Sequence, residues 1–185
     1  MNVEQLVAIQ NINANNLDGQ KKLVEIMFGV DPLTLPFDEF LVMTAKIPQL
    51  FSEMDKTFKP EVDIDGVKFY AKELTSFSTR EFIDFDTLAK EGNGAIPTLL
   101  ALIYTNEEYA GKEYVAGIKE KAEIMKKMDA GTALGAINFF SRALLEYVRN
   151  LAVSSPKAKE MMEKNPAMKE AMEKMTRFLD GDGQA

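Results

Sequence analysis

The strongest helical pattern in the sequence lies between residues 131 and 152, and it predicts the centre of the hydrophobic core. Apolar side chains recur there at spacings of three and four residues: Ala133, Ile137, Phe140, Leu144, Tyr147 and Leu151. The apolar face is widened by Leu134, Ala136, Phe139, Leu145 and Val148. A helix that is apolar around most of its circumference is normally buried on several sides, so we expect this helix to lie among the others.

Helical spacing extends over much of the remaining chain. Before residue 60 it indicates short helices over 3–12 and 18–28, and a further helix that begins near Pro36. The apolar face predicted for that third helix consists of Phe37, Phe40, Leu41 and Thr44. After residue 78 the pattern indicates helices over 79–90, 96–105, 111–127, 156–164 and 166–179.

The pattern changes to a period of two residues in "EVDIDGVKFYAKEL", which predicts a β-hairpin around residues 61–73. Asp65-Gly66 stands between the two alternating runs, and both residue types tolerate the positive φ of a type I′ turn. The outer edge of such a hairpin carries unpaired backbone groups that could pair with a strand of a partner. Alternatively, Lys68 and Lys72 guard that edge against pairing.

The C-terminal segment differs from the rest, because it is rich in Met, Lys and Glu. A narrow apolar seam runs along it at spacings of seven, four, three and four residues: Met161, Met168, Met172, Met175 and Leu179. This spacing is typical of a coiled coil or of an amphipathic helix that docks on another surface. Two interpretations of the seam therefore stay open: it packs onto the protein's own core, or it binds a partner.

Together these patterns predict a mainly α protein of α+β character. We expect a multi-helix bundle with one β-hairpin and a helical, Met-rich C-terminal extension. The expected division is a core domain over 1–153, into which the hairpin is inserted, and an amphipathic helical tail over 154–185.

The composition restricts the chemistry that the protein can perform more than it restricts the fold. The 185 residues include no Cys, His or Trp and carry a net charge of -7. Without Cys and His the chain cannot build a disulfide, a Cys/His zinc site or a Ser–His–Asp arrangement. The acidic charge disfavours nucleic acid and anionic membranes as partners, because both require clusters of basic residues. An enzyme of this composition would have to use carboxylates, Lys, Tyr or an oxygen-bound metal.

An acidic cluster is the best candidate for such chemistry. It consists of Glu81, Asp84, Asp86 and Glu91 in "STREFIDFDTLAKE". One hypothesis is a carboxylate-based, metal-dependent enzyme centred on Asp84, Asp86 and Glu91. The structural alternative, which we favour, is a capping box in which Ser78 and Glu81 satisfy each other's backbone N–H groups, with most of the acids facing solvent. In that case Phe82, Phe85 and Ala89 would face the core.

Three short motifs resemble ligand-binding loops but lack essential residues. In "DIDG" and "DGDG" the calcium-loop pattern fails, since the twelfth position counted from Asp63 is Leu74 and the chain ends soon after Asp180. "EGNGA" has neither of the two phosphate-binding glycine patterns and is better read as a helix-to-helix connector. We therefore expect no catalytic residue, no metal ligand and no cofactor.

The start "MNVEQLVAIQ" has no basic segment followed by a long apolar stretch, and no apolar run approaches the length of a membrane span. We expect a soluble, intracellular protein.

One stretch resembles a family of bacteriophage proteins. The sequence runs from a hairpin into Phe82-Ile83-Asp84-Phe85 and an apolar helix, "LLALIY". A charged segment with Glu113-Tyr114 and a helix with Asn138-Phe139-Phe140 follow. Over roughly residues 60–150 this order resembles tail assembly chaperones and small virion proteins of tailed phages, including crAss-like and related large phages. The shared motifs are packing motifs and carry no active site.

The resemblance implies a non-enzymatic morphogenesis or virion protein that acts through protein–protein contacts, most simply a tail assembly chaperone. Its implied partners are other phage structural proteins: tape-measure, tail-tube, portal-proximal or capsid proteins, or further copies of itself. We expect it in the host cytoplasm during assembly, or in the virion. The alternatives are a packaged cargo or minor structural protein of the particle, the metal-dependent enzyme, and a cellular helical adaptor with no viral connection.

Overall fold

A computed structural model describes the backbone of residues 1–10 and 12–154, and the side chains of these residues except 93 and 148–154. Contacts divide the chain into two units, Met1–Ile137 and Asn138–Ala185. The described part is mainly helical with a small antiparallel sheet, which confirms the predicted fold class. The expected helical tail, from residue 155 onward, lies outside the described residues.

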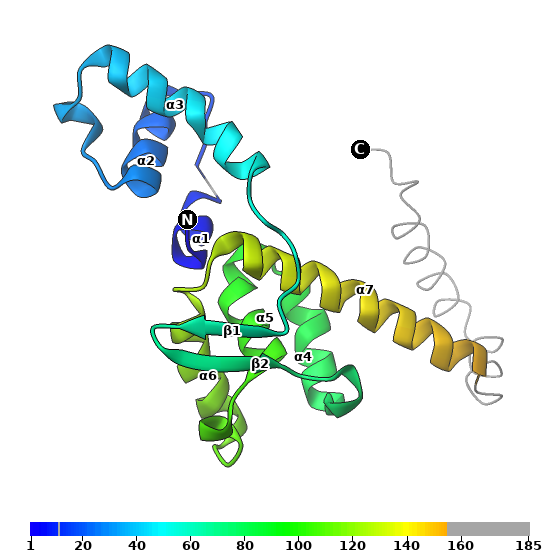
Figure 1. Ribbon diagram of the computed structural model, residues 1–185. Coiled ribbons are helices and arrows are strands. Elements are labelled where there is room, and N and C mark those ends of the chain that lie inside the picture. The colour runs from blue at the N-terminus through cyan, green and yellow to red at the C-terminus, as the bar shows by residue number, and fades with distance from the viewer. Residues whose placement is uncertain (11, 155–185) are drawn as a thin grey trace. The chain divides into compact units, whose positions relative to one another are not determined.

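The elements are shown in Figure 1, and their bounds are as follows. The helices are α1 (Val3–Ile9), α2 (Leu17–Phe28), α3 (Phe37–Ser52), α4 (Thr79–Ala89), α5 (Ile96–Ile103), α6 (Tyr114–Met125) and α7 (Ala130–Ser154). The strands are β1 (Glu61–Ile64), β2 (Val67–Ala71) and β3 (Tyr104–Thr105). The 3-10 turns are η1 (Pro32–Thr34), η2 (Leu74–Ser76), η3 (Asn93–Ala95) and η4 (Glu107–Tyr109).

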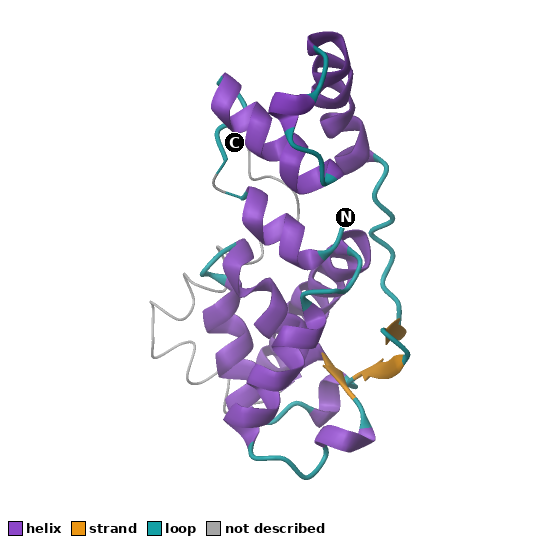
Figure 2. Cartoon of the chain, turned by 90° about the vertical axis from the view of Figure 1, so that its left-hand side faces the viewer, coloured by secondary structure: helices purple, strands orange, loops and turns teal. Residues whose placement is uncertain are grey.

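The predicted hairpin is present, and its turn has the predicted conformation. Asp65 and Gly66 have φ angles of 54° and 82°, the positive values that a type I′ turn requires. Val62 lies opposite Phe69 in the β1–β2 ladder, and both side chains are buried while Asp63 is exposed. The alternation therefore turns one face of the sheet towards the helices. The sheet lies at one side of the helices in Figure 2.

A third strand was not predicted from the sequence. We expected a helix over 96–105, but α5 ends at Ile103, and Tyr104–Thr105 pairs with β2 to give the order β1-β2-β3. The Tyr104 hydroxyl donates a hydrogen bond of 2.6 Å to the carbonyl of Lys59. This contact satisfies the polar end of a fully buried ring, whose pKa burial raises to about 12.

Helix α5 is the most completely buried helix of the first unit. All of its residues except Thr98 are buried, and it packs against α6, α4 and α1. We predicted that the helix over 131–152 forms the centre of the hydrophobic core, but in this unit α5 does so. Within 131–152, Phe140 and Leu144 are buried as predicted, whereas Phe139 and Tyr147 are 45% and 43% exposed.

The start of α7 is held against an extended segment that joins α3 to β1. A Cβ atom on Gly131 would lie 2.5 Å from the carbonyl oxygen of Asp55, and one on Gly135 would lie 2.4 Å from that of Lys56. Both distances are too short for any real Cβ, so the backbones can approach only because these positions are glycine. The N-terminus is attached nearby, where Val3 N–H donates to the carbonyl of Met128 at 2.9 Å.

Candidate functional site

The acidic cluster begins with the predicted capping box. The backbone N–H of Ser78 donates to the Glu81 carboxylate at 2.9 Å, and the N–H of Glu81 donates to the Ser78 hydroxyl at 3.2 Å. The two side chains satisfy two N–H groups at the start of α4, which confirms the structural interpretation of Glu81.

The other three acids of the cluster each have a separate environment. Asp84 accepts a hydrogen bond of 2.8 Å from the Tyr114 hydroxyl, Asp86 pairs with Lys90 at 2.6 Å, and Glu91 is exposed. Among the residues that the structure describes, no group of three or more Asp, Glu, His or Cys is arranged to hold a metal ion. The arrangement therefore does not bring Asp84, Asp86 and Glu91 together as a site.

The buried face of α4 is rotated relative to the prediction. Phe85 is 3% exposed, as expected, but Ala89 is exposed and Phe82 is only half-buried. The buried residues are Glu81 and Phe85. The prediction was wrong for Ala89, because the buried side of α4 runs through Glu81, which turns inward to a cation, and not through Ala89.

That cation is Lys72, which forms an ion pair with the Glu81 carboxylate. The side chains are 18% and 10% exposed, so both charges are largely removed from water. Burial acts to raise the pKa of Glu81, but the hydrogen bonds from Lys72 and Ser78 outweigh it and hold the pKa below its usual 4.5. Lys72 is thus a buried partner rather than a guard of the hairpin edge.

Lys68, the other expected guard, also lies away from the free edge. It belongs to β2, which is the middle strand, and its ammonium group pairs with Glu61 of β1 at 2.7 Å. The two edge strands of the sheet are β1 and β3. The interpretation of both lysines as edge guards was therefore wrong, because β3 occupies the other side of β2.

A second lysine lies close to the Lys72–Glu81 pair. Lys121 of α6 is only 4% exposed, and its ammonium group donates a hydrogen bond of 3.0 Å to the carbonyl of Tyr104. Burial, together with the positive charge of Lys72, lowers the pKa of Lys121 to about 8. These groups line a cavity of about 250 Å³ between the end of β2, α4 and α6.

The buried position of Lys121 could have been predicted from the helical pattern of the sequence, but we did not predict it. Gly117, Lys121 and Met125 recur at intervals of four residues, and all three are buried on one face of α6. A lysine at the apolar position of a helical pattern indicates a buried charge. The position of Glu81 beside it could not be inferred, because the two residues are brought together only by the packing of α4 and α6.

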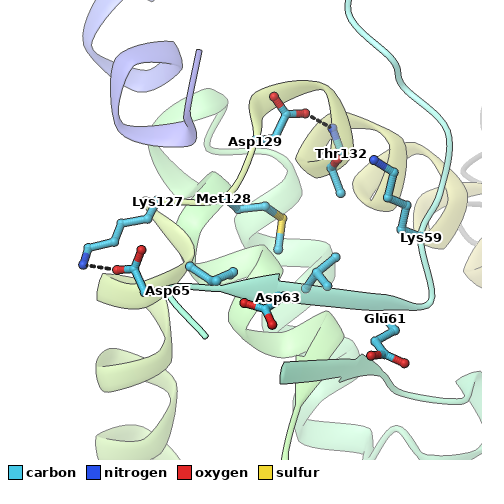
Figure 3. A pocket seen from close by; sticks show the side chains of 10 residues that line it. Lys59, Glu61, Asp63, Asp65, Lys127, Met128, Asp129 and Thr132 are labelled. Atoms are coloured by element: carbon cyan, nitrogen blue, oxygen red, sulfur yellow. Dashed lines mark hydrogen bonds and ion pairs between the residues drawn. The ribbon is translucent and has the colours of Figure 1, made fainter. Parts of the chain in front are cut away.

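A larger cavity, of about 400 Å³, lies between β1 and the turn from α6 to α7 (Figure 3). Its charged side chains already have partners in the protein. Lys127 pairs with Asp65, and Asp129 accepts a hydrogen bond of 2.9 Å from the N–H of Thr132 at the start of α7. Figure 3 shows Asp63 directed away from Asp129, so the acids around this hollow do not converge. The contacts are those of a capped helix start beside a turn.

The clearest candidate for a binding surface is formed by exposed apolar residues. Leu33 and Phe37 are 77% and 71% exposed, and Val42 and Leu41 are 54% and 49% exposed. They belong to η1 and the first half of α3, and together we call them the η1–α3 surface. Single exposed apolar residues are ordinary, but four within ten positions form a cluster of the kind that marks contact sites.

This surface exists because α3 buries only one edge of its apolar face. Phe40 and Ile47 are buried and α3 packs against α2, whereas Phe37 and Leu41 are turned outward. We had predicted Phe37, Phe40, Leu41 and Thr44 as one core-facing set, which is correct only for Phe40. The apolar face is wider than α2 can cover.

The sequence-predicted partner residues lie elsewhere. Met161, Met168, Met172, Met175 and Leu179 all fall outside the described residues, so their roles stay predictions. Within the described part of the chain, no helix is both long and apolar enough to cross a membrane.

Comparison with known proteins adds no relative. The chain matches no family model, no curated protein and no solved structure at a significant level. Any functional assignment therefore depends on the residues themselves and on the resemblance described above.

Proposed function

We propose that this protein is a non-enzymatic bacteriophage morphogenesis protein of the tail assembly chaperone type, which acts through protein–protein contacts. The resemblance over residues 60–150 supports this class. The observation that carries the mode of action is the η1–α3 surface, with Leu33 and Phe37 more than two-thirds exposed. A protein that shields aggregation-prone helices needs apolar area that remains accessible in its own folded state.

The chemistry of this surface favours one kind of occupant. Residues 17–54 contain six carboxylates and three lysines, a net charge of -3. Asp38 and Glu39 are exposed in the first turn of α3, directly beside Phe37. An amphipathic helix would place its apolar face on Phe37 and Leu41 and its basic flanks beside these acids. We propose that the occupant is such a helix from the tape-measure protein of the same phage.

Co-expression tests this proposal. The tape-measure protein encoded beside this gene is produced with and without the protein, and its soluble fraction and co-purification are measured. The proposal predicts that the tape-measure protein becomes soluble and co-purifies. It is contradicted if neither occurs, or if the neighbouring genes include no portal, capsid or tape-measure gene.

Mass spectrometry of purified mature particles separates the chaperone from its nearest alternative. A chaperone is expected in assembly intermediates and absent from the particle. A packaged cargo or minor structural protein is expected in the particle in several copies. The second outcome would retain the phage class and overturn the chaperone role.

A further inference from the structure

The cavity around Lys121 contains a buried positive charge without an ionic partner. Ten ion pairs are found among the described residues, and none of them includes Lys121. Its ammonium group has three N–H donors, and the hydrogen bond to Tyr104 uses one of them. Buried charges in proteins are normally paired, because removing an ion from water is costly.

The other charged groups around Lys121 do not balance it. Lys72 and Glu81 neutralise each other, and the Glu81 carboxylate is also occupied by Ser78. Glu113, at the mouth, accepts hydrogen bonds from the N–H groups of Val115 and Ala116. Helix α5, which packs against α6, carries no titratable side chain. Lys121 is therefore the one ammonium group of the lining without an ion pair among the described residues.

The other polar groups of the lining are already engaged, which leaves Lys121 as the contact for an anion in a small cavity. The centroid of the Tyr109 ring lies 4.4 Å from the ammonium group of Lys112 and 5.9 Å from that of Lys121. The Lys112 charge is itself neutralised by Glu120. The Tyr114 hydroxyl donates to Asp84, so it is not available to bind an anion. The volume of about 250 Å³ is below the range of about 300–1,000 Å³ that drug-sized ligands occupy.

From this arrangement we infer that the cavity binds a small monocarboxylate, whose negative charge pairs with the ammonium group of Lys121. A single ammonium group without an ion pair fits a single negative charge better than it fits a phosphate dianion. The free acid and the carboxylate end of a peptide share this chemistry. The site is separate from the η1–α3 surface, so it does not depend on the proposed chaperone role.

Titration of the full-length protein with sodium acetate tests the site. The backbone amide chemical shifts of the cavity-lining residues Thr105 and Gly117 are followed by NMR, and sodium chloride keeps the ionic strength constant. We expect a saturable shift with acetate and a weaker response to inorganic phosphate. Because only the protonated lysine pairs with the anion, affinity should be about tenfold lower at pH 9 than at pH 7. A C-terminal dipeptide replaces acetate in a second arm, and tighter binding of that dipeptide would identify a peptide end as the natural source.

Two variants distinguish a site from a general effect of charge. Lys121→Met keeps an unbranched side chain of nearly the same length without the charge, and it should abolish the acetate response. Lys119→Met removes an exposed lysine of the same helix and should leave the response unchanged. The inference is overturned if acetate produces no saturable shift, if phosphate binds more tightly than acetate, or if the two variants behave alike. Thermal unfolding of both variants, followed by circular dichroism, verifies that they are folded.

Discussion

Two regions of the first unit depart from the usual distribution of polar and apolar residues, and they do so in opposite directions. Between α4 and α6, charged side chains are buried: Glu81 and Lys121 are 8% and 4% exposed. On η1 and α3, large apolar side chains are exposed, with Leu33 and Phe37 at 77% and 71%. Each arrangement costs free energy that a simpler sequence would avoid.

The two regions differ in whether their unusual residues find partners within the described part of the chain. The Glu81 charge is satisfied within the chain by Lys72 and Ser78, which leaves Lys121 as the one buried charged residue without an ionic partner among the described residues. The apolar area of Leu33 and Phe37 is not covered within the first unit. The buried region is therefore nearly self-sufficient, whereas the apolar area of the η1–α3 surface is not removed from water by the rest of the first unit.

The largest contrast is expected between two phenylalanines. Phe69 is fully buried and its ring stacks on that of Tyr109 with centroids 6.3 Å apart, so Phe69→Ala should lower the free energy of unfolding by about 3–5 kcal/mol. Phe37→Ala removes the same atoms from an exposed site and should change the free energy of unfolding by less than about 0.5 kcal/mol. Urea denaturation measures both values. Equal losses would show that Phe37 is covered and would remove the η1–α3 surface as a candidate.

The buried ion pair should make stability depend on pH. The pKa of Glu81 is lower in the folded protein than its ordinary value of 4.5, so its contribution is complete above about pH 4.5 and is lost as the pH falls through the folded value. Glu81→Gln should lower stability at pH 7 by about 2–3 kcal/mol, because it leaves Lys72 without its ionic partner.

The pH profile separates this effect from a simple loss of packing. Unfolding of the wild type and of Glu81→Gln is compared between pH 3 and pH 7. Their stabilities should converge at the acid end of this range. A constant difference across the range would contradict the role given to the ionised carboxylate.

A smaller loss is expected where the chain segments cross. Gly135→Ala would place a Cβ atom 2.4 Å from the Lys56 carbonyl oxygen, and the resulting backbone shift should cost about 1–3 kcal/mol. Gly111→Ala is the matched control, since a Cβ there meets no atom within 4 Å. Thermal unfolding followed by circular dichroism compares the two variants. A Gly135→Ala protein as stable as the control would mean that the close crossing is not maintained.

The comparison also shows which features could be predicted from the sequence. The Asp65-Gly66 turn and the Ser78–Glu81 capping box follow from local backbone chemistry, and both were predicted correctly. Strand β3 was missed because Tyr104 and Thr105 continue an apolar helical run, and only pairing with β2 ends it. A local pattern contains no information about a partner strand more than thirty residues away.

The candidate sites were less predictable than the elements. The orientation of Phe37 depends on how much of α3 is covered by α2, and the inward turn of Glu81 depends on Lys72. Both are properties of tertiary packing rather than of spacing. Within the described residues, periodicity identified the helices to within about three residues at their ends but placed Phe37, Leu41 and Ala89 on the wrong side of them.

The most direct test of the account compares the η1–α3 surface with another exposed apolar site in the same binding assay. The double variant Leu33→Ser/Phe37→Ser is set against Ile83→Ser, which changes a 56% exposed side chain on α4. Binding of each purified variant to a synthetic peptide of the tape-measure protein's amphipathic helix is measured by calorimetry. We predict that the double variant remains folded and binds at least about tenfold more weakly, a loss of about 1.4 kcal/mol, while Ile83→Ser binds like the wild type. Wild-type affinity in the double variant would contradict the central claim that this protein acts through its η1–α3 surface.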